Sequence, residues 1–248
     1  MSQTHPACEG PVAGVDGCRG GWVAVRWEAD GPAGVHLART FGDLGPLLAG
    51  CARVLVDMPI GLPTAERPVR ACDQAARRRL GWPRSATVFS PPCTEAAEAD
   101  DYATALRANR AVTGRGLSQQ AYGLGPKILE VAQALATWPP EEARPVESHP
   151  ELCWQALFPD RSLPSKHKPE GVRERLDLLE PLLGRPGERR PRRVAGVGWG
   201  QADLADAGVL ALAARSPCEE LGGPALAGLP AYLLPQPLPA TGIGEENG

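Results

Sequence analysis

Several features are missing from this 248-residue chain, and each absence excludes a class of protein. Its seven cysteines form no C-x-x-C pair, and their odd number and scatter fit neither a disulfide framework nor a zinc knuckle. No apolar run approaches the roughly 18 residues that cross a bilayer, and the first residues lack the basic and apolar regions of a secretory signal. We therefore expect a cytoplasmic protein with reduced thiols and no membrane contact.

Positive charge and aromatic side chains are also scarce. The net charge of −3 excludes the global positive field of a protein that coats nucleic acid without specificity. Only three of the 26 basic residues are lysines, and the guanidinium of arginine is the better fork for phosphate and carboxylate. A GC-rich genome would produce the same bias, so the arginine content alone assigns no partner.

Glycine and proline, in contrast, are abundant. The chain has 29 glycines and 27 prolines, while 43% of its residues are apolar and 22% are charged. This composition is typical of a globular protein with many turns and short elements, and it excludes a coiled coil, collagen and disorder throughout.

The order of the elements predicts a mixed sheet flanked by helices, an α/β fold. We expect a flexible N-terminus over 1–11, one domain over 12–221 with a helical insertion at about 63–140, and a Gly/Pro-rich tail over 222–248. The arginine-rich stretch 184–193 is expected to be a solvated loop. Strands are expected at 12–16, 22–27, 35–40, 53–57 and around 147, and helices at 41–50, 68–80, 94–112, 118–137, 151–158, 170–183 and 203–215.

Acidic residues stand at the ends of these expected elements. Asp16 ends the first strand, Asp57 ends the fourth, Glu147 lies in the late strand, and Asp203 and Asp206 share one face of the last helix. Neighbouring parallel strands end on one side of a sheet, so these carboxylates can converge. Each also has a structural interpretation, because aspartate commonly forms turns after strands and caps helices.

Converging carboxylates require a cation among them, and Mg²⁺ or Mn²⁺ is the natural one because hard cations take oxygen ligands. Two such ions would hold the attacking and leaving oxygens of a displacement at phosphorus. The acids therefore predict a metal-dependent phosphodiesterase with Asp16, Asp57, Glu147 and Asp206 as catalytic residues, and with Asp203 as a further metal ligand.

Other side chains are candidates for contact with substrate. Arg19 lies in a glycine-rich link between two strands and could fork onto a phosphate, although a plain hairpin explains the link equally well. Lys166 is a candidate phosphate contact, and His149 could orient a water or leaving group; surface decoration and a structural role are their alternatives. Cys18 lies in the same link, but the sequence places no base beside it.

Motifs in a fixed order resemble one family, the family of unknown function numbered 429, described as predicted RNase H-like nucleases. The resemblance extends from about residue 12 to 215. The motifs are GVDGCRGGW at 14–22, VDMPIGLP at 56–63, CDxxAR at 72–77 with VFSxP at 88–92, GLSxQA at 116–121 with PKIxE at 126–130, and ESHPE at 147–151.

The resemblance implies an RNase H-like fold of three layers, with a five-stranded mixed sheet in the order 3-2-1-4-5 and helices on both faces. By analogy with RuvC-type resolvases of that fold, Asp16, Asp57 and the pair Asp203 and Asp206 hold metal ions, and Glu147 joins or replaces one of them. Relatives often carry a double acid before the last helix, where this chain has Ala202 and Asp203.

Two other functions stay open. The same fold core supports ATP-dependent phosphotransferases and ATPases of the actin-like superfamily, although these duplicate the domain and this chain shows no repeat. A non-catalytic binding module with a degenerate site is the other. The five candidate acids carry a charge of −5, so the rest of the chain carries +2. Metal ions bound to these acids would reverse the local negative charge. This allows a nucleic acid substrate and favours a short or structured one over long non-specific binding.

Overall fold

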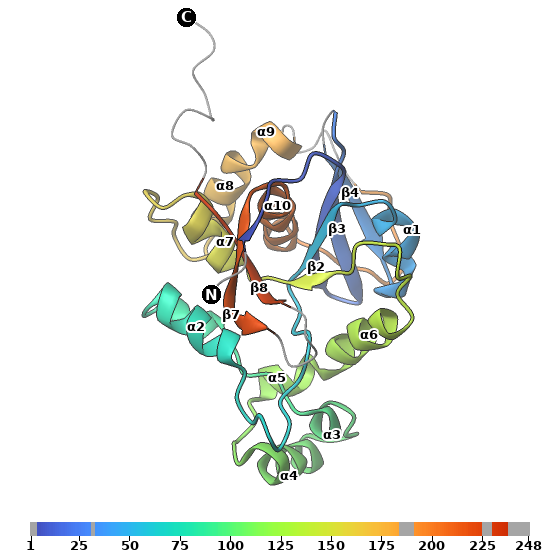
Figure 1. Cartoon of the computed structure of the whole chain (residues 1–248), viewed down its shortest axis with the longest axis vertical. Helices are drawn as coiled ribbons and strands as arrows, with labels where there is room; N and C mark the ends of the chain where they lie inside the picture. The colour runs from blue at the N-terminus through green and yellow to red at the C-terminus, as the bar shows by residue number, and fades with distance from the viewer. Residues whose placement is uncertain (1–3, 31–32, 184–190, 225–229, 238–248) are drawn as a thin grey trace, which may run out of the picture.

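A five-stranded mixed sheet forms the centre of the protein, which we describe from a computed structural model covering residues 4–30, 33–183, 191–224 and 230–237 (Figure 1). The strand order is β4-β3-β2-β5-β6, with antiparallel pairing of β2 with β3 and β3 with β4, and parallel pairing of β5 with β2 and β6. The predicted order of the five strands is confirmed. The strands are β2 (Val12–Cys18), β3 (Gly21–Trp27), β4 (Gly34–Ala38), β5 (Arg53–Val56) and β6 (Val146–Glu147).

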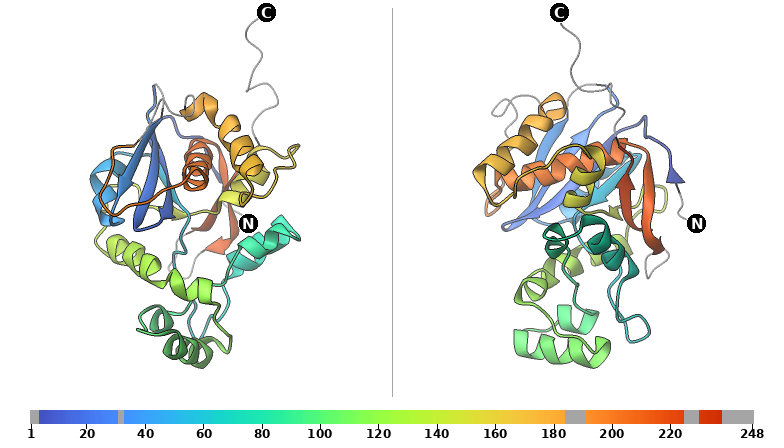
Figure 2. Two further views of the ribbon diagram at one scale, coloured as in Figure 1. Left: turned by 180° about the vertical axis from the view of Figure 1, so that it is seen from behind. Right: turned by 90° about the vertical axis from the view of Figure 1, so that its left-hand side faces the viewer.

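Alternating residues of β2 face two separate apolar clusters. Val12 packs with one cluster, whereas Ala13 and Val15 pack with the other. Helices therefore cover both faces of the sheet (Figures 1 and 2). The first face carries α7 (Pro150–Leu157), α8 (Pro169–Leu178), α9 (Glu180–Leu183) and α10 (Gln201–Arg215); the second carries η1 (Gly42–Leu44), α1 (Gly45–Leu48) and α6 (Gly125–Ala136).

Gly14 allows α10 to approach the sheet closely. A Cβ atom at this position would lie 2.2 Å from the carbonyl oxygen of Ala207 and 2.3 Å from the amide nitrogen of Ala211. Both atoms belong to the backbone of α10, so no side-chain rearrangement could relieve the clash. The glycine thus fixes α10 against β2, and with it the acidic first turns of the helix.

A helical insertion separates β5 from β6, as predicted. Its smaller helices stand beyond the sheet at the lower end of the molecule (Figure 1). The predicted helix 94–112 is divided into α3 (Thr94–Ala97) and α4 (Tyr102–Thr113). The predicted helix 118–137 is divided into α5 (Gln119–Gly123) and α6, because Gly123, Gly125 and Pro126 disfavour a continuous helix. Besides α6, the insertion contains α2 (Ala71–Leu80), η2 (Arg84–Thr87), α3 (Thr94–Ala97), α4 (Tyr102–Thr113) and α5 (Gln119–Gly123).

The chain termini form a second sheet that the sequence pattern does not predict. It has the order β1-β7-β8, from β1 (Thr4–His5), β7 (Cys218–Pro224) and β8 (Pro230–Pro235). The expectation of loose order over 1–11 and 222–248 is therefore wrong for these strands, since β1 pairs with β7, and Tyr232 and Leu234 of β8 are buried against α2 and α7. Of the predicted loop 184–193, residues 184–190 lie outside the described part of the chain.

The remaining global expectations concern cysteines and membranes. All seven cysteines lie in the described residues, and all are free thiols. No helix of the described residues combines the length and the apolar character needed to cross a membrane.

Candidate functional site

Three aspartates from three elements gather at the carboxyl ends of β2 and β5, and we call them the acid cluster: Asp16, Asp57 and Asp206. Asp16 lies in β2, and Asp57 follows β5 and donates its amide to the carbonyl of Val15 at 2.9 Å. Asp206 lies in the second turn of α10, the helix that Gly14 holds against β2. Asp16 and Asp206 are buried, whereas Asp57 is partly exposed.

Burial and mutual repulsion make these carboxyls hard to ionise. Burial raises the pKa of Asp16 well above its ordinary value, and the charges of Asp57 and Asp206 raise it further. Burial also raises the pKa of Asp57 to about 6 and that of Asp206 to about 6, in both cases against the attraction of Lys166. The three groups therefore act as one coupled set.

Lys166 is the cation that faces the acid cluster. Its ammonium forms an ion pair with Asp206, and although burial lowers its pKa, the charges of Asp206, Asp57 and Asp16 hold that pKa above its ordinary value. One ammonium faces three carboxyl groups, so it can balance the charge of only one of them. The Oδ1 atom of Asp206 is buried and has no hydrogen-bond partner.

These observations bear on whether the site suits a metal ion. No group of three or more His, Cys, Asp or Glu side chains within the described residues is close enough to hold a metal alone. Mg²⁺, however, is usually bound by one or two carboxylates, with water and substrate oxygens completing its octahedron. The surplus negative charge and the unpartnered Asp206 oxygen fit a divalent cation bound in that way.

Glu147, predicted to join the metal ligands, lies instead in a separate ion-pair network. Its carboxylate pairs with Arg70 and accepts the backbone amide of Ile60 at 2.7 Å. Arg70 Nη1 is also 3.3 Å from Asp73 Oδ1, which accepts the Tyr232 hydroxyl at 3.1 Å. We call Arg70, Asp73, Glu147 and Tyr232 the Arg70 network; these four residues are buried.

Asp203 and Asp206 take different roles on α10. Asp203 is partly exposed, and its Oδ2 accepts the backbone amide of Gly200 at 2.7 Å, which caps the helix. Its charge still raises the pKa of Asp16, after those of Asp57 and Asp206. The structure thus places Asp206 in the acid cluster and Asp203 at its margin.

Arg19, His149 and Cys18 lie around the site without joining the cluster. Arg19 is exposed, and its carbonyl accepts the amide of Gly198 at 2.8 Å. His149 Nε2 lies 3.5 Å from the carbonyl oxygen of Thr87, and burial lowers the pKa of the imidazole. Burial raises the pKa of the Cys18 thiol to about 11, so this cysteine is protonated at neutral pH.

A second lysine, Lys127, was missed in the sequence. It extends from α6 on the opposite face, donates to the carbonyl of Gly21 and lies 4.3 Å from the ring centre of Trp22. Burial lowers its pKa, although Asp16 is among the acids that act against that shift. The scarcity of lysine was a sequence signal for this residue. The chain has only three lysines, and two of them, Lys127 and Lys166, lie near the ends of β2 and β5.

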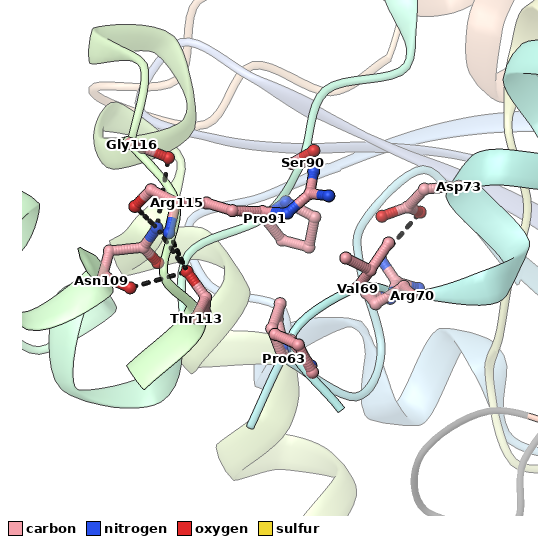
Figure 3. A pocket seen from close by; sticks show the side chains of 11 residues that line it. Pro63, Val69, Arg70, Asp73, Ser90, Pro91, Asn109, Thr113, Arg115 and Gly116 are labelled. Carbon is pink, nitrogen blue, oxygen red and sulfur yellow. Dashed lines mark hydrogen bonds and ion pairs between the residues drawn. The ribbon is translucent and has the colours of Figure 1, made fainter. Parts of the chain in front are cut away.

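A pocket of about 310 Å³ lies between the start of α2 and the α4–α5 loop (Figure 3). Arg70 and Asp73 line one side, and Arg115 extends from the other side toward Ser90. The buried side chain of Asn109 fixes the loop by donating to the carbonyl of Arg115 at 3.1 Å. The pocket therefore borders the Arg70 network at the β6 edge of the sheet.

Comparison of the chain with known protein families gives one match. A family model described as "Protein of unknown function (DUF429)" matches residues 14–225. No curated protein and no solved structure matches the chain. Because the family model covers most of the sequence, the chain belongs to the DUF429 family.

Proposed function

We propose that this protein is a metal-dependent phosphodiesterase of the RNase H-like type, acting on nucleic acid with Mg²⁺ or Mn²⁺. The observation that carries the proposal is the acid cluster itself. Three carboxyl groups from β2, the end of β5 and α10 act together on the Lys166 ammonium, which forms an ion pair with Asp206. Such an arrangement destabilises the metal-free protein and is compensated by a divalent cation.

Asp16, Asp57 and Asp206 are the residues that would hold the cation. A bound divalent ion would lower the pKa of a coordinated water and neutralise charge on the phosphoryl oxygens. Glu147 is excluded from our ligand set because Arg70 and the amide of Ile60 already occupy one of its oxygens. The proposal is therefore narrower than the set of five acids expected from sequence.

Lys166 is the residue we assign to the substrate phosphate. Its side chain is 28% exposed, so it can reach a ligand as well as Asp206. When a cation neutralises Asp206, the ammonium is free to pair with a phosphate oxygen. Lys166 would thus compensate the acids in the free protein and bind substrate in the complex.

The direct test is cleavage of labelled RNA, DNA, hybrid and branched substrates with Mn²⁺ or with EDTA. Asp16→Asn and Asp206→Asn should each lower the rate about a hundredfold or more, since loss of groups that only orient metal ligands already costs 10- to 100-fold. Asp177→Asn, on the exposed surface of α8, is the matched control and should cleave like wild type. Equal cleavage by wild type and Asp16→Asn would refute the site.

The same preparation separates the alternatives. Stabilisation by ATP without cleavage would favour a phosphotransferase or ATPase of the actin-like type. A melting temperature that responds to neither Mn²⁺ nor nucleotide would favour a non-catalytic binding module.

A further inference from the structure

Positive charge is concentrated in two segments of this acidic protein, the arginine-rich stretch 184–193 and residues 63–90, of which the second lies wholly in the described part of the chain. Residues 63–90 carry six arginines against one glutamate and one aspartate, a net charge of +4 in a chain whose total is −3. The distribution of charge matters more than the total for contact with a polyanion. This segment contains α2 and η2, on the side of the molecule where α2 packs against α7 (Figure 1).

Only some of these arginines have structural partners. Arg70 belongs to the Arg70 network, and Arg77 donates to the carbonyl of Val88 at 3.0 Å. Arg84 donates a hydrogen bond to the carbonyl of Leu163. Arg78 and Arg79, in the last turn of α2, are exposed and have no hydrogen bond or ion pair with any described residue. Their charges are therefore available to a ligand.

Trp82 stands next to these two arginines. Its side chain is 85% exposed, the one large hydrophobic residue so exposed among those described. The helix ends at Leu80, and Gly81 adopts a φ of +65°, which turns the chain and leaves Trp82 outside the helix. An exposed aromatic side chain and two unpaired arginines within five residues of chain are the combination that binds single-stranded nucleic acid, through stacked bases and backbone phosphates.

The segment that follows Trp82 is hydrogen-bonded to the segment that leads to Lys166. Arg84 Nη2 donates to the carbonyl of Leu163 at 3.0 Å, three residues before Lys166. Thr87 lies next to His149, whose pKa responds to both Lys166 and Asp206. These contacts connect the chain that follows Trp82 with the segment that carries Lys166 to the acid cluster.

We propose that Trp82, Arg78 and Arg79 form a platform that binds single-stranded RNA or DNA and directs it to the acid cluster. The proposal deepens the proposed function, since it names an unpaired strand as the substrate. Trp82 stacks on a base, and the two arginines contact adjacent backbone phosphates.

Binding of a fluorescent 12-nucleotide RNA or DNA to the full chain in EDTA tests the platform without cleavage. Trp82→Ala should weaken binding about tenfold, and Trp82→Phe, which keeps an aromatic face, should restore most of it. The double variant Arg78→Ala/Arg79→Ala should reduce the dependence of log K on log salt by about 0.7 for each phosphate that it no longer neutralises. Arg110→Ala, an exposed arginine in the last turn of α4, is the matched control.

The outcomes distinguish this platform from the acid cluster. Unchanged binding by Trp82→Ala and by the double arginine variant overturns the platform, as does tighter binding of a 12-base-pair duplex than of either single strand. Failure of wild type to bind any strand in EDTA also overturns it. The acid cluster is tested separately, by comparing Mn²⁺-dependent cleavage by wild type with that by Asp16→Asn.

Discussion

The acid cluster and the Arg70 network are two groups of buried charge that lie on neighbouring strands. Asp57 follows Val56 of β5, and Glu147 of β6 pairs with that same Val56. In the Arg70 network one guanidinium lies between two carboxylates, and Tyr232 and the Ile60 amide supply further hydrogen bonds. In the acid cluster, three carboxylates share one ammonium.

We interpret the difference as one between a structural arrangement, the Arg70 network, and the functional site proposed above. Buried charges persist when partners and hydrogen bonds compensate their lost hydration, as they do around Arg70. The acid cluster has one ammonium for three carboxyl groups, whereas the Arg70 network has one guanidinium for two. Each group leaves one buried polar atom without a hydrogen bond, Oδ1 of Asp206 and Nη1 of Arg70. The divalent cation that we propose would supply the positive charge that the acid cluster lacks.

Removing the cation of the Arg70 network should have the largest effect. Arg70→Met would leave Glu147 and Asp73 buried without their counter-charge, and breaking a buried pair in this way costs about 3–5 kcal/mol. For a domain of this size the melting temperature should fall by about 6–20 °C, as measured by calorimetry. Arg67→Met, at an exposed position nearby, is the control and should change it little. A loss below about 1 kcal/mol would contradict the structural role.

Supplying a cation to the acid cluster should have the next largest effect. Mn²⁺ at a hundred times its dissociation constant should stabilise wild type by about 2.7 kcal/mol, provided that it binds only the folded state. Asp206→Asn should abolish most of this increase, whereas Asp177→Asn should keep it. An equal Mn²⁺ response in wild type and Asp206→Asn would place the metal elsewhere.

The contrast also explains how much the sequence could predict. The sequence could place Asp16 and Asp57 together because it predicts each at the end of a strand of a parallel pair, and strand ends follow from local hydrophobic pattern. In the structure β2 continues to Cys18, but its pairing with β5 ends at Val15, so Asp16 and Asp57 still follow the paired residues of both strands. Glu147 meets the same criterion, yet it pairs with Arg70, a residue 77 positions away in the helical insertion. Long-range pairing of this kind leaves no local signal. The same reason conceals β8, whose residues pair with β7 although proline and glycine around them indicate a loose tail.

In the metal-free protein, pH should act through the acid cluster. The folded pKa of Asp206 is about 6 against 3.8 for an ordinary aspartate, so the folded state keeps this proton to higher pH. The contribution of Asp206 to the free energy of unfolding is therefore most favourable below about pH 4, and it is lost as the pH rises through 6.

The measurement is the melting temperature in EDTA between pH 4 and 8. The difference between Asp206→Asn and wild type should increase in favour of the variant as pH rises, and Mn²⁺ should reduce that difference. A difference that stays constant with pH would contradict the shifted titration of Asp206.

The smallest effect is expected from Tyr232→Phe, which removes one hydrogen bond from the Arg70 network. The Tyr232 hydroxyl donates to Asp73 Oδ1 at 3.1 Å in a buried setting, and a bond to a charged acceptor contributes about 1.5 kcal/mol. The melting temperature should fall by about 3–6 °C, while the stabilisation by Mn²⁺ stays unchanged. Because Tyr232 belongs to β8, a fall of this size would also show that the second sheet contributes to stability. A changed Mn²⁺ response would mean that the two groups of charge are coupled, and the separation between a structural and a functional group would then no longer hold.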